Sequence, residues 1–82
     1  MPKTFAGLDR LGVDPNVLGG APHILGTRIS VRRALEIIAQ YPDRTELRAD
    51  YPTLDDEALR QVLAYAAAEV GGRVIALDRP AA

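Results

Sequence analysis

Residues 14–31 read DPNVLGGAPHILGTRISV, and this stretch decides what the chain can fold into. Its three glycines and two prolines constrain the backbone path, because glycine permits positive φ and proline holds φ near about −65°. Apolar side chains recur between them, whereas a disordered linker is rich in Ser, Gln and Lys. We therefore expect an ordered arm of strands and turns that leads directly into a helix.

The whole chain has 82 residues, of which 48% are hydrophobic, and a formal charge of −1. This length supports one domain with one small core, for which a homodimer or partner interface would bury further apolar surface. The charge is uneven: residues 1–48 sum to +2 (seven Lys and Arg against five Asp and Glu), and residues 49–82 sum to −3 (three against six). The N-terminal part is therefore the better candidate for contacting an anion.

The composition excludes several classes of protein. The chain has no cysteine and one histidine, so disulfides, cysteine nucleophiles and the usual zinc ligand sets are excluded. No apolar run approaches the ~18 residues of a membrane span, and the N-terminus has no apolar segment of the signal-peptide kind. We expect a cytoplasmic protein that has no membrane contact, metal, cofactor or enzymatic activity.

Apolar periodicity after the arm predicts three helices, at about residues 31–40, 44–50 and 55–70. Ser30 is the expected N-cap of the first helix, Asp43 of the second, and Thr53 or Asp55 of the third. The third helix opens on acidic side chains, which suit the positive end of a helix dipole. Its expected apolar face comprises Leu59, Val62, Leu63, Ala66 and Val70.

The arm covers residues 11–29, and a single domain is expected over residues 11–72. Residues 1–10 show no clean period and are expected to be partly mobile, while residues 73–82 form a β-prone tail. Three helices with a short middle one favour a mainly α fold. Its core would be a three-helix helix-turn-helix unit, preceded by a short β-hairpin or arm.

Arginines are the best candidates for contacts with an anion. Arg28, Arg32 and Arg33 lie at the start of the first helix, where the helix dipole adds positive potential. They could meet nucleic-acid phosphates or the carboxylates of a protein partner, or form internal ion pairs with Asp14 or Glu36. The full set of candidates for DNA or partner binding is Arg28, Arg32, Arg33, Arg44, Arg48, Arg60 and Gln61.

Three other functional interpretations of the sequence have little support: a phosphate-binding loop, a catalytic histidine and a DNA-reading third helix. Gly20–Thr27 superficially matches a phosphate-binding loop, but it has five residues between its glycines instead of four and lacks the lysine. His23 has no recognisable catalytic partner, so its expected role is contact with solvent or with a partner. The third helix would read DNA poorly, because its first turn is acidic and only Arg60, Gln61 and Tyr65 remain to contact bases.

The order of residues is similar to that of a known family. The chain resembles the domain-of-unknown-function family 433 (DUF433) of small bacterial and archaeal proteins over about residues 11–67. The strings that carry the resemblance are GGxPxIxGTRIxV from Gly19, DYPxL from Asp50 and VLAYA from Val62. The positions expected to fix the structure are Gly19, Gly20, Pro22, Gly26, Thr27, Tyr51 and Pro52.

This resemblance implies a homeodomain-like or winged helix-turn-helix fold and a homodimer. It also implies an antitoxin of a VapBC-type module, which neutralises a PIN-like ribonuclease toxin and contacts operator DNA. The alternative is a homodimeric adaptor that binds protein but not DNA. Two segments depart from the family: residues 41–45 (YPDRT) stand where Gly followed by Ser or Thr is usual, and residues 74–77 lie outside the matched part.

Overall fold

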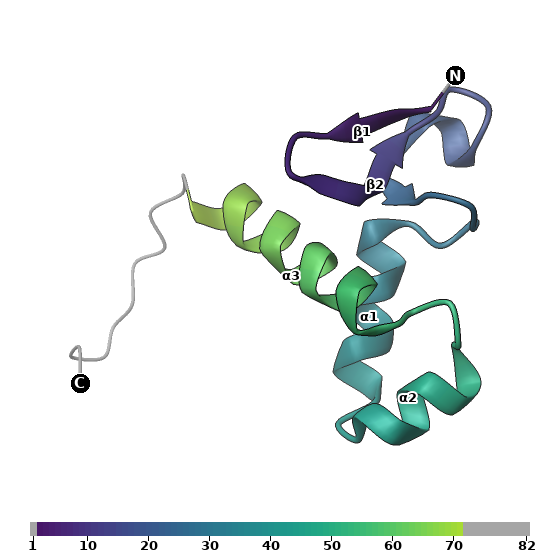
Figure 1. Cartoon of the computed structure of the whole chain (residues 1–82), viewed down its shortest axis with the longest axis vertical. Helices are drawn as coiled ribbons and strands as arrows, with labels where there is room; N and C mark the ends of the chain where they lie inside the picture. The colour runs from purple at the N-terminus through teal and green to yellow at the C-terminus, as the bar shows by residue number, and fades with distance from the viewer. Residues whose placement is uncertain (1, 72–82) are drawn as a thin grey trace.

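A computed structural model describes residues 2–71 (Figure 1). Three strands form one antiparallel sheet in the order β1-β2-β3. The elements are β1 (Lys3–Phe5), β2 (Leu8–Val13), the 3₁₀ turn η1 (Leu18–Gly20), β3 (His23–Ile24), α1 (Val31–Gln40), α2 (Arg44–Asp50) and α3 (Asp56–Gly71). The β-prone tail expected at residues 73–82 lies outside the described residues.

The sheet shows that the predicted mainly α fold is wrong. A three-stranded antiparallel sheet precedes three helices, so the architecture is α+β and the homeodomain-like or winged helix-turn-helix class does not hold. The segment 1–10, expected to be partly mobile, contributes β1 and the start of β2, with Lys3 paired to Val13. Periodicity could not reveal β1, because three residues are too few to establish a period of two.

The helices begin where the expected caps lie. Ser30 Oγ accepts a hydrogen bond from the N–H three residues later at 2.9 Å, and Asp43 Oδ1 accepts one from the N–H two residues later at 2.8 Å. Asp55 Oδ1 likewise accepts the N–H three residues later at 2.9 Å. As a result, α1 and α2 have the predicted bounds, and α3 begins and ends one residue later than predicted.

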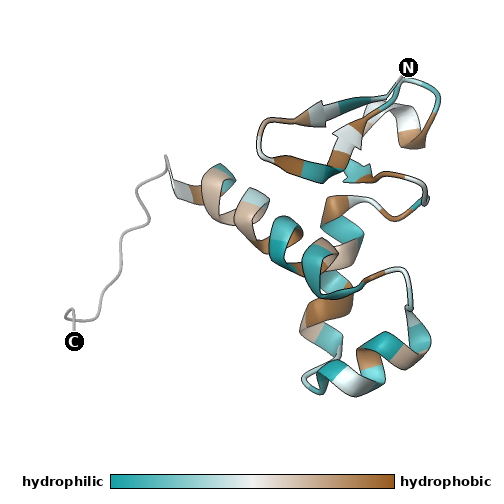
Figure 2. Cartoon of the chain, viewed as in Figure 1, coloured by the Kyte–Doolittle hydropathy of each residue, from teal (hydrophilic) through white to brown (hydrophobic). Residues whose placement is uncertain are grey.

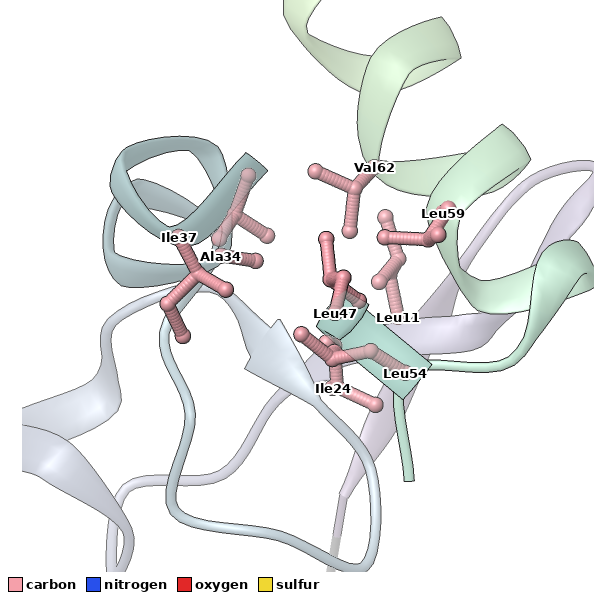
Figure 3. Close-up of a cluster of buried hydrophobic side chains, with 9 residues drawn as sticks. Leu11, Ile24, Ala34, Ile37, Leu47, Leu54, Leu59 and Val62 are labelled. Atoms are coloured by element: carbon pink, nitrogen blue, oxygen red, sulfur yellow. The ribbon is translucent and has the colours of Figure 1, made fainter. Parts of the chain in front are cut away.

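The hydrophobic core joins the sheet to all three helices (Figure 3). Leu11 of the middle strand, Leu47 of α2 and Leu59 of α3 are fully buried in it. Burying one such leucine contributes about 2 kcal/mol. The buried apolar residues are Leu11, Ile24, Val31, Ala34, Ile37, Leu47, Leu54, Ala58, Leu59 and Val62.

Candidate functional site

The glycine-rich arm packs against the start of α1. Gly19 and Gly20 end η1, and φ at Gly20 and Gly26 is 86° and 82°, which glycine adopts without strain. Thr27 fixes the last turn, because its Oγ1 donates to the carbonyl of Ile24 at 2.7 Å and accepts the N–H two residues later at 3.0 Å. The carbonyl of Pro22 then accepts the N–H of the first residue of α1 at 2.9 Å. These motif residues therefore hold the arm in place.

His23 is buried, so the expected contact with solvent or a partner is wrong. Its side chain is 2% exposed, and its Nδ1 lies 3.0 Å from the carbonyl oxygen of Ala21. The backbone of His23 pairs with Gly12 of β2 and bridges to Ser30 before α1. The residue is enclosed because β3 lies between the middle strand and the first helix.

The three arginines at the start of α1 are exposed. Arg32 Nε and Arg33 Nη1 both approach the carboxylate of Glu36, at 3.8 and 3.4 Å. Asp14, the other acidic partner considered, instead accepts the backbone N–H two residues later at 2.9 Å. One carboxylate therefore offsets part of the positive charge that these arginines and Arg28 bring to this surface.

The other three candidate arginines pair with acidic residues at the start of α3. Arg44 and Arg48 of α2 lie 3.2 and 3.1 Å from the same Oδ1 of Asp56. Arg60 Nη2 lies 2.7 Å from Oε2 of Glu57. Exposed pairs of this kind contribute roughly 0–1 kcal/mol each. Their main effect is to neutralise charge that a phosphate would otherwise meet.

Gln61 joins β2 to α3 from inside the molecule, where it is 2% exposed. Its Oε1 accepts the N–H of Arg10 at 2.7 Å, and its Nε2 donates to the carboxylates of Asp9 and Glu57, both at 2.8 Å. The guanidinium of Arg10 donates to Asp55 Oδ1 at 2.8 Å. Gln61 is among the sequence candidates for contacting DNA or a partner, yet its polar atoms are used within the chain.

Tyr51 and Pro52 follow α2 and lead the chain toward α3. The ring of Tyr51 packs edge-on against Tyr41, with centroids 5.8 Å apart. Tyr41 Oη donates to the carboxylate of Asp50 at 2.6 Å, and this hydrogen bond raises the pKa of Tyr41 to about 12. The carbonyl of Tyr51 accepts the N–H of Leu54 at 2.9 Å, which turns the chain into the core.

The apolar face of α3 is only partly covered. Its N-terminal half crosses α1 and packs on β2, whereas its C-terminal half extends past α1 (Figure 1). Leu59 and Val62 are buried as expected, but Leu63 is 44% and Val70 51% exposed. Figure 2 shows hydrophilic residues in the first turns and mainly apolar residues in the last turns.

An open groove of about 530 Å³ lies between α1 and this second half of α3. We call it the α1–α3 groove. Its charged residues are Arg32 on the α1 side and Glu69 on the α3 side. Its apolar lining includes Leu18, Pro22, Leu35, Tyr65, Ala66 and Val70. The groove therefore offers an apolar contact surface with one charge of each sign.

Over residues 2–71, no group of three or more His, Cys, Asp or Glu side chains is arranged to hold a metal ion. In that same part of the chain, no helix combines the length and apolarity needed to span a membrane.

A family model described as "Protein of unknown function (DUF433)" matches residues 12–66. The chain belongs to this family. The match confirms the family resemblance, and it runs from the end of β2 through the arm, α1 and α2 to the middle of α3. A search of curated proteins and a search of solved structures found no match. Glu69 and Val70 of the groove lie beyond the segment matched to DUF433.

Sequence reasoning missed the groove because it assigned the whole apolar face of α3 to the core. The available signal was the length of that face, which runs from Leu59 to Val70. A chain of 82 residues forms one small core, which leaves part of so long a face uncovered. Leu35 belongs to the apolar face expected for the first helix, whereas Leu18 and Glu69 carried no recognisable pattern of their own.

Acidification should weaken the hydrogen-bond network around Gln61. Hydrogen bonds from Arg60 and then Gln61 lower the pKa of Glu57 from 4.5 to about 2. A carboxylate whose pKa is lowered on folding contributes stability above its unfolded pKa and loses it as pH falls toward the folded value. The free energy of unfolding should therefore fall between about pH 4.5 and 2, and less steeply in Glu57→Gln.

Urea unfolding at about pH 7 and about pH 3 measures this difference. Glu46→Gln, at an exposed position of α2 outside the network, is the matched control and should keep the wild-type pH slope. Equal slopes in wild type and Glu57→Gln would contradict the assigned role of Glu57.

Proposed function

We propose that this chain is a protein-binding module of the antitoxin type, whose partner is a PIN-like ribonuclease toxin. The observation that supports protein binding is the α1–α3 groove, where half of an apolar helix face is left open. Apolar surface bordered by charged residues is typical of protein-interaction sites. The module acts by holding another chain, and its own residues perform no reaction.

The charge distribution favours a protein partner over DNA. Five of the six candidate arginines lie within 4 Å of a carboxylate, so a phosphate would have to compete with those pairs. The acidic first turn of α3 would also repel a DNA backbone. Contact with operator DNA through Arg28, Arg32, Arg33, Arg44 or Arg48 stays a prediction.

The choice of a toxin as partner rests on the resemblance to DUF433. Membership in that family supports the resemblance, and the groove supplies a surface suited to protein contacts. Neutralisation would occur in the cytoplasm, the location expected from the sequence. A homodimeric adaptor is the alternative, and it differs from the antitoxin in having no effect on a toxin.

Co-expression with the product of the neighbouring gene tests the antitoxin role. We expect a tagged copy of this chain to co-purify with that product and to relieve the growth arrest that it causes alone. An unrelated acidic protein of the same length, expressed from the same plasmid, controls for non-specific relief. Co-purification without relief would favour the adaptor, and neither co-purification nor relief would contradict the proposal.

A further inference from the structure

We infer that the α1–α3 groove binds a second copy of this chain, so that two grooves close on each other across a two-fold axis. The inference rests on the proposed protein-binding function and names the partner of its surface. Three features support it: the charges of the groove are self-complementary, Ala66 in its α3 wall has a small side chain, and Val70 in the groove and Leu63 outside its lining are exposed apolar residues spaced for a helix pair.

The two charges of the groove would pair between copies. The side chain of Arg32 is 89% exposed, and within residues 2–71 its one ion-pair partner is Glu36, at 3.8 Å. Glu69 forms no ion pair with any residue in the range 2–71. A two-fold axis sets the α1 wall of one copy against the α3 wall of the other, and does so twice. Arg32 of each copy can then reach Glu69 of its partner.

The exposed half of α3 can also approach another helix closely. Ala66 lines the groove, and a small side chain at this position lets two helix axes approach more closely. Leu63 and Val70, seven residues apart, lie on the same face of the helix on either side of Ala66. In an antiparallel pair of α3 helices, Leu63 of one copy would meet Val70 of the other.

Such a pair would cover the two large apolar side chains that are most exposed among residues 2–71. A small domain benefits from this burial because its own core is limited by its length. Neither Arg28 nor any residue of α2 lines the groove, so the same two-fold arrangement would leave them available to a toxin. A toxin would then meet the dimer rather than the single chain.

Sedimentation equilibrium of the full chain, from about 1 to 100 µM, measures the association. We expect a dimer whose dissociation constant rises by at least about tenfold in Ala66→Glu, because a carboxylate is placed inside the closed groove. Ala68→Glu is the matched control: the same change on the same helix, but outside the groove and exposed. Val70→Glu, at a position already 51% exposed, repeats the test where misfolding is least expected.

Charge reversal tests the pairing itself. Arg32→Glu and Glu69→Arg should each dimerise less tightly than wild type, because like charges then face each other twice. When the two variants are mixed, residues 32 and 69 carry opposite charges in both contacts of the mixed dimer. The population of the mixed dimer should therefore exceed that of either homodimer by about tenfold. An ion pair within one chain cannot produce this preference. Native mass spectrometry of the two variants with different tags counts the three species.

A wild-type chain that stays monomeric to about 100 µM would overturn the inference. The occupant of the groove would then be a segment outside the described residues or another protein. A dimer that is unaffected by Ala66→Glu and Val70→Glu would overturn it too, as would random mixing of the charge variants. The proposed function is tested separately. If the chain forms a dimer with the expected charge pairing but neither binds the toxin nor relieves its growth arrest, this inference stands and the antitoxin role is rejected.

Discussion

Gly12→Ala is expected to lower the free energy of unfolding by about 3 kcal/mol, a large part of the roughly 4–12 kcal/mol typical of a chain this long. Gly12 lies in the middle strand, paired with Thr4 on one side and His23 on the other. A Cβ at this position would collide with the carbonyl oxygen of Lys3 and lie 3.0 Å from that carbonyl carbon. The backbone of β1 cannot move away without losing its pairing with β2.

The matched control is Gly7→Ala in the turn between β1 and β2. Gly7 has a φ of 76°, but no heavy atom lies within 4 Å of the place that an alanine Cβ would take, so only the backbone conformation is penalised. That penalty is about 1 kcal/mol. Guanidinium unfolding of both variants measures the difference, and an equal cost for the two would show that β1 can yield at Lys3.

Gln61→Leu should lower the free energy of unfolding by about 2 kcal/mol. The substitution keeps the size of the side chain but removes the acceptor for the N–H of Arg10 and the donor to Asp9 and Glu57. A buried N–H without a partner costs about 1–3 kcal/mol, whereas removing both partners of a hydrogen bond costs little. The effect should also appear as faster amide exchange at Arg10, where β2 meets α3.

Gln40→Leu provides the control, since Gln40 is the other glutamine and is exposed at the end of α1. It should change the free energy of unfolding by less than about 0.5 kcal/mol. If Gln61→Leu were equally mild, burial of the leucine would be offsetting the lost hydrogen bonds, and Gln61 would not be what ties the sheet to α3.

The candidate site was only partly predictable from the sequence. Arg28, Arg32 and Arg33 could be placed on an exposed surface, because each follows directly from the position of the first helix. The partners of the arginines could not be foreseen in the same way: Arg44 and Arg48 meet Asp56 across the α2–α3 connection. The burial of His23 and Gln61 was equally hidden, since polarity alone does not reveal that neighbouring elements enclose a side chain.

The sequence by itself determined the local structure of this protein. Ser30, Asp43 and Asp55 cap their helices through atoms two or three residues away, and glycines and prolines bend the arm by constraints on their own dihedral angles. Such effects act over a few residues and can be read from spacing.

Only the tertiary structure decided the sheet and the groove. β1 has three residues and forms because Lys3 and Thr4 pair with Val13 and Gly12 of β2. No pattern within residues 3–5 predicts this pairing. The apolar face of α3 is uniform in sequence, yet Val62 is buried and Val70 is half exposed. The physical reason is that the burial of a residue depends on how much surface the other elements offer to it. Here they reach Tyr65, which packs against Phe5 of β1, and leave residues 67–71 exposed.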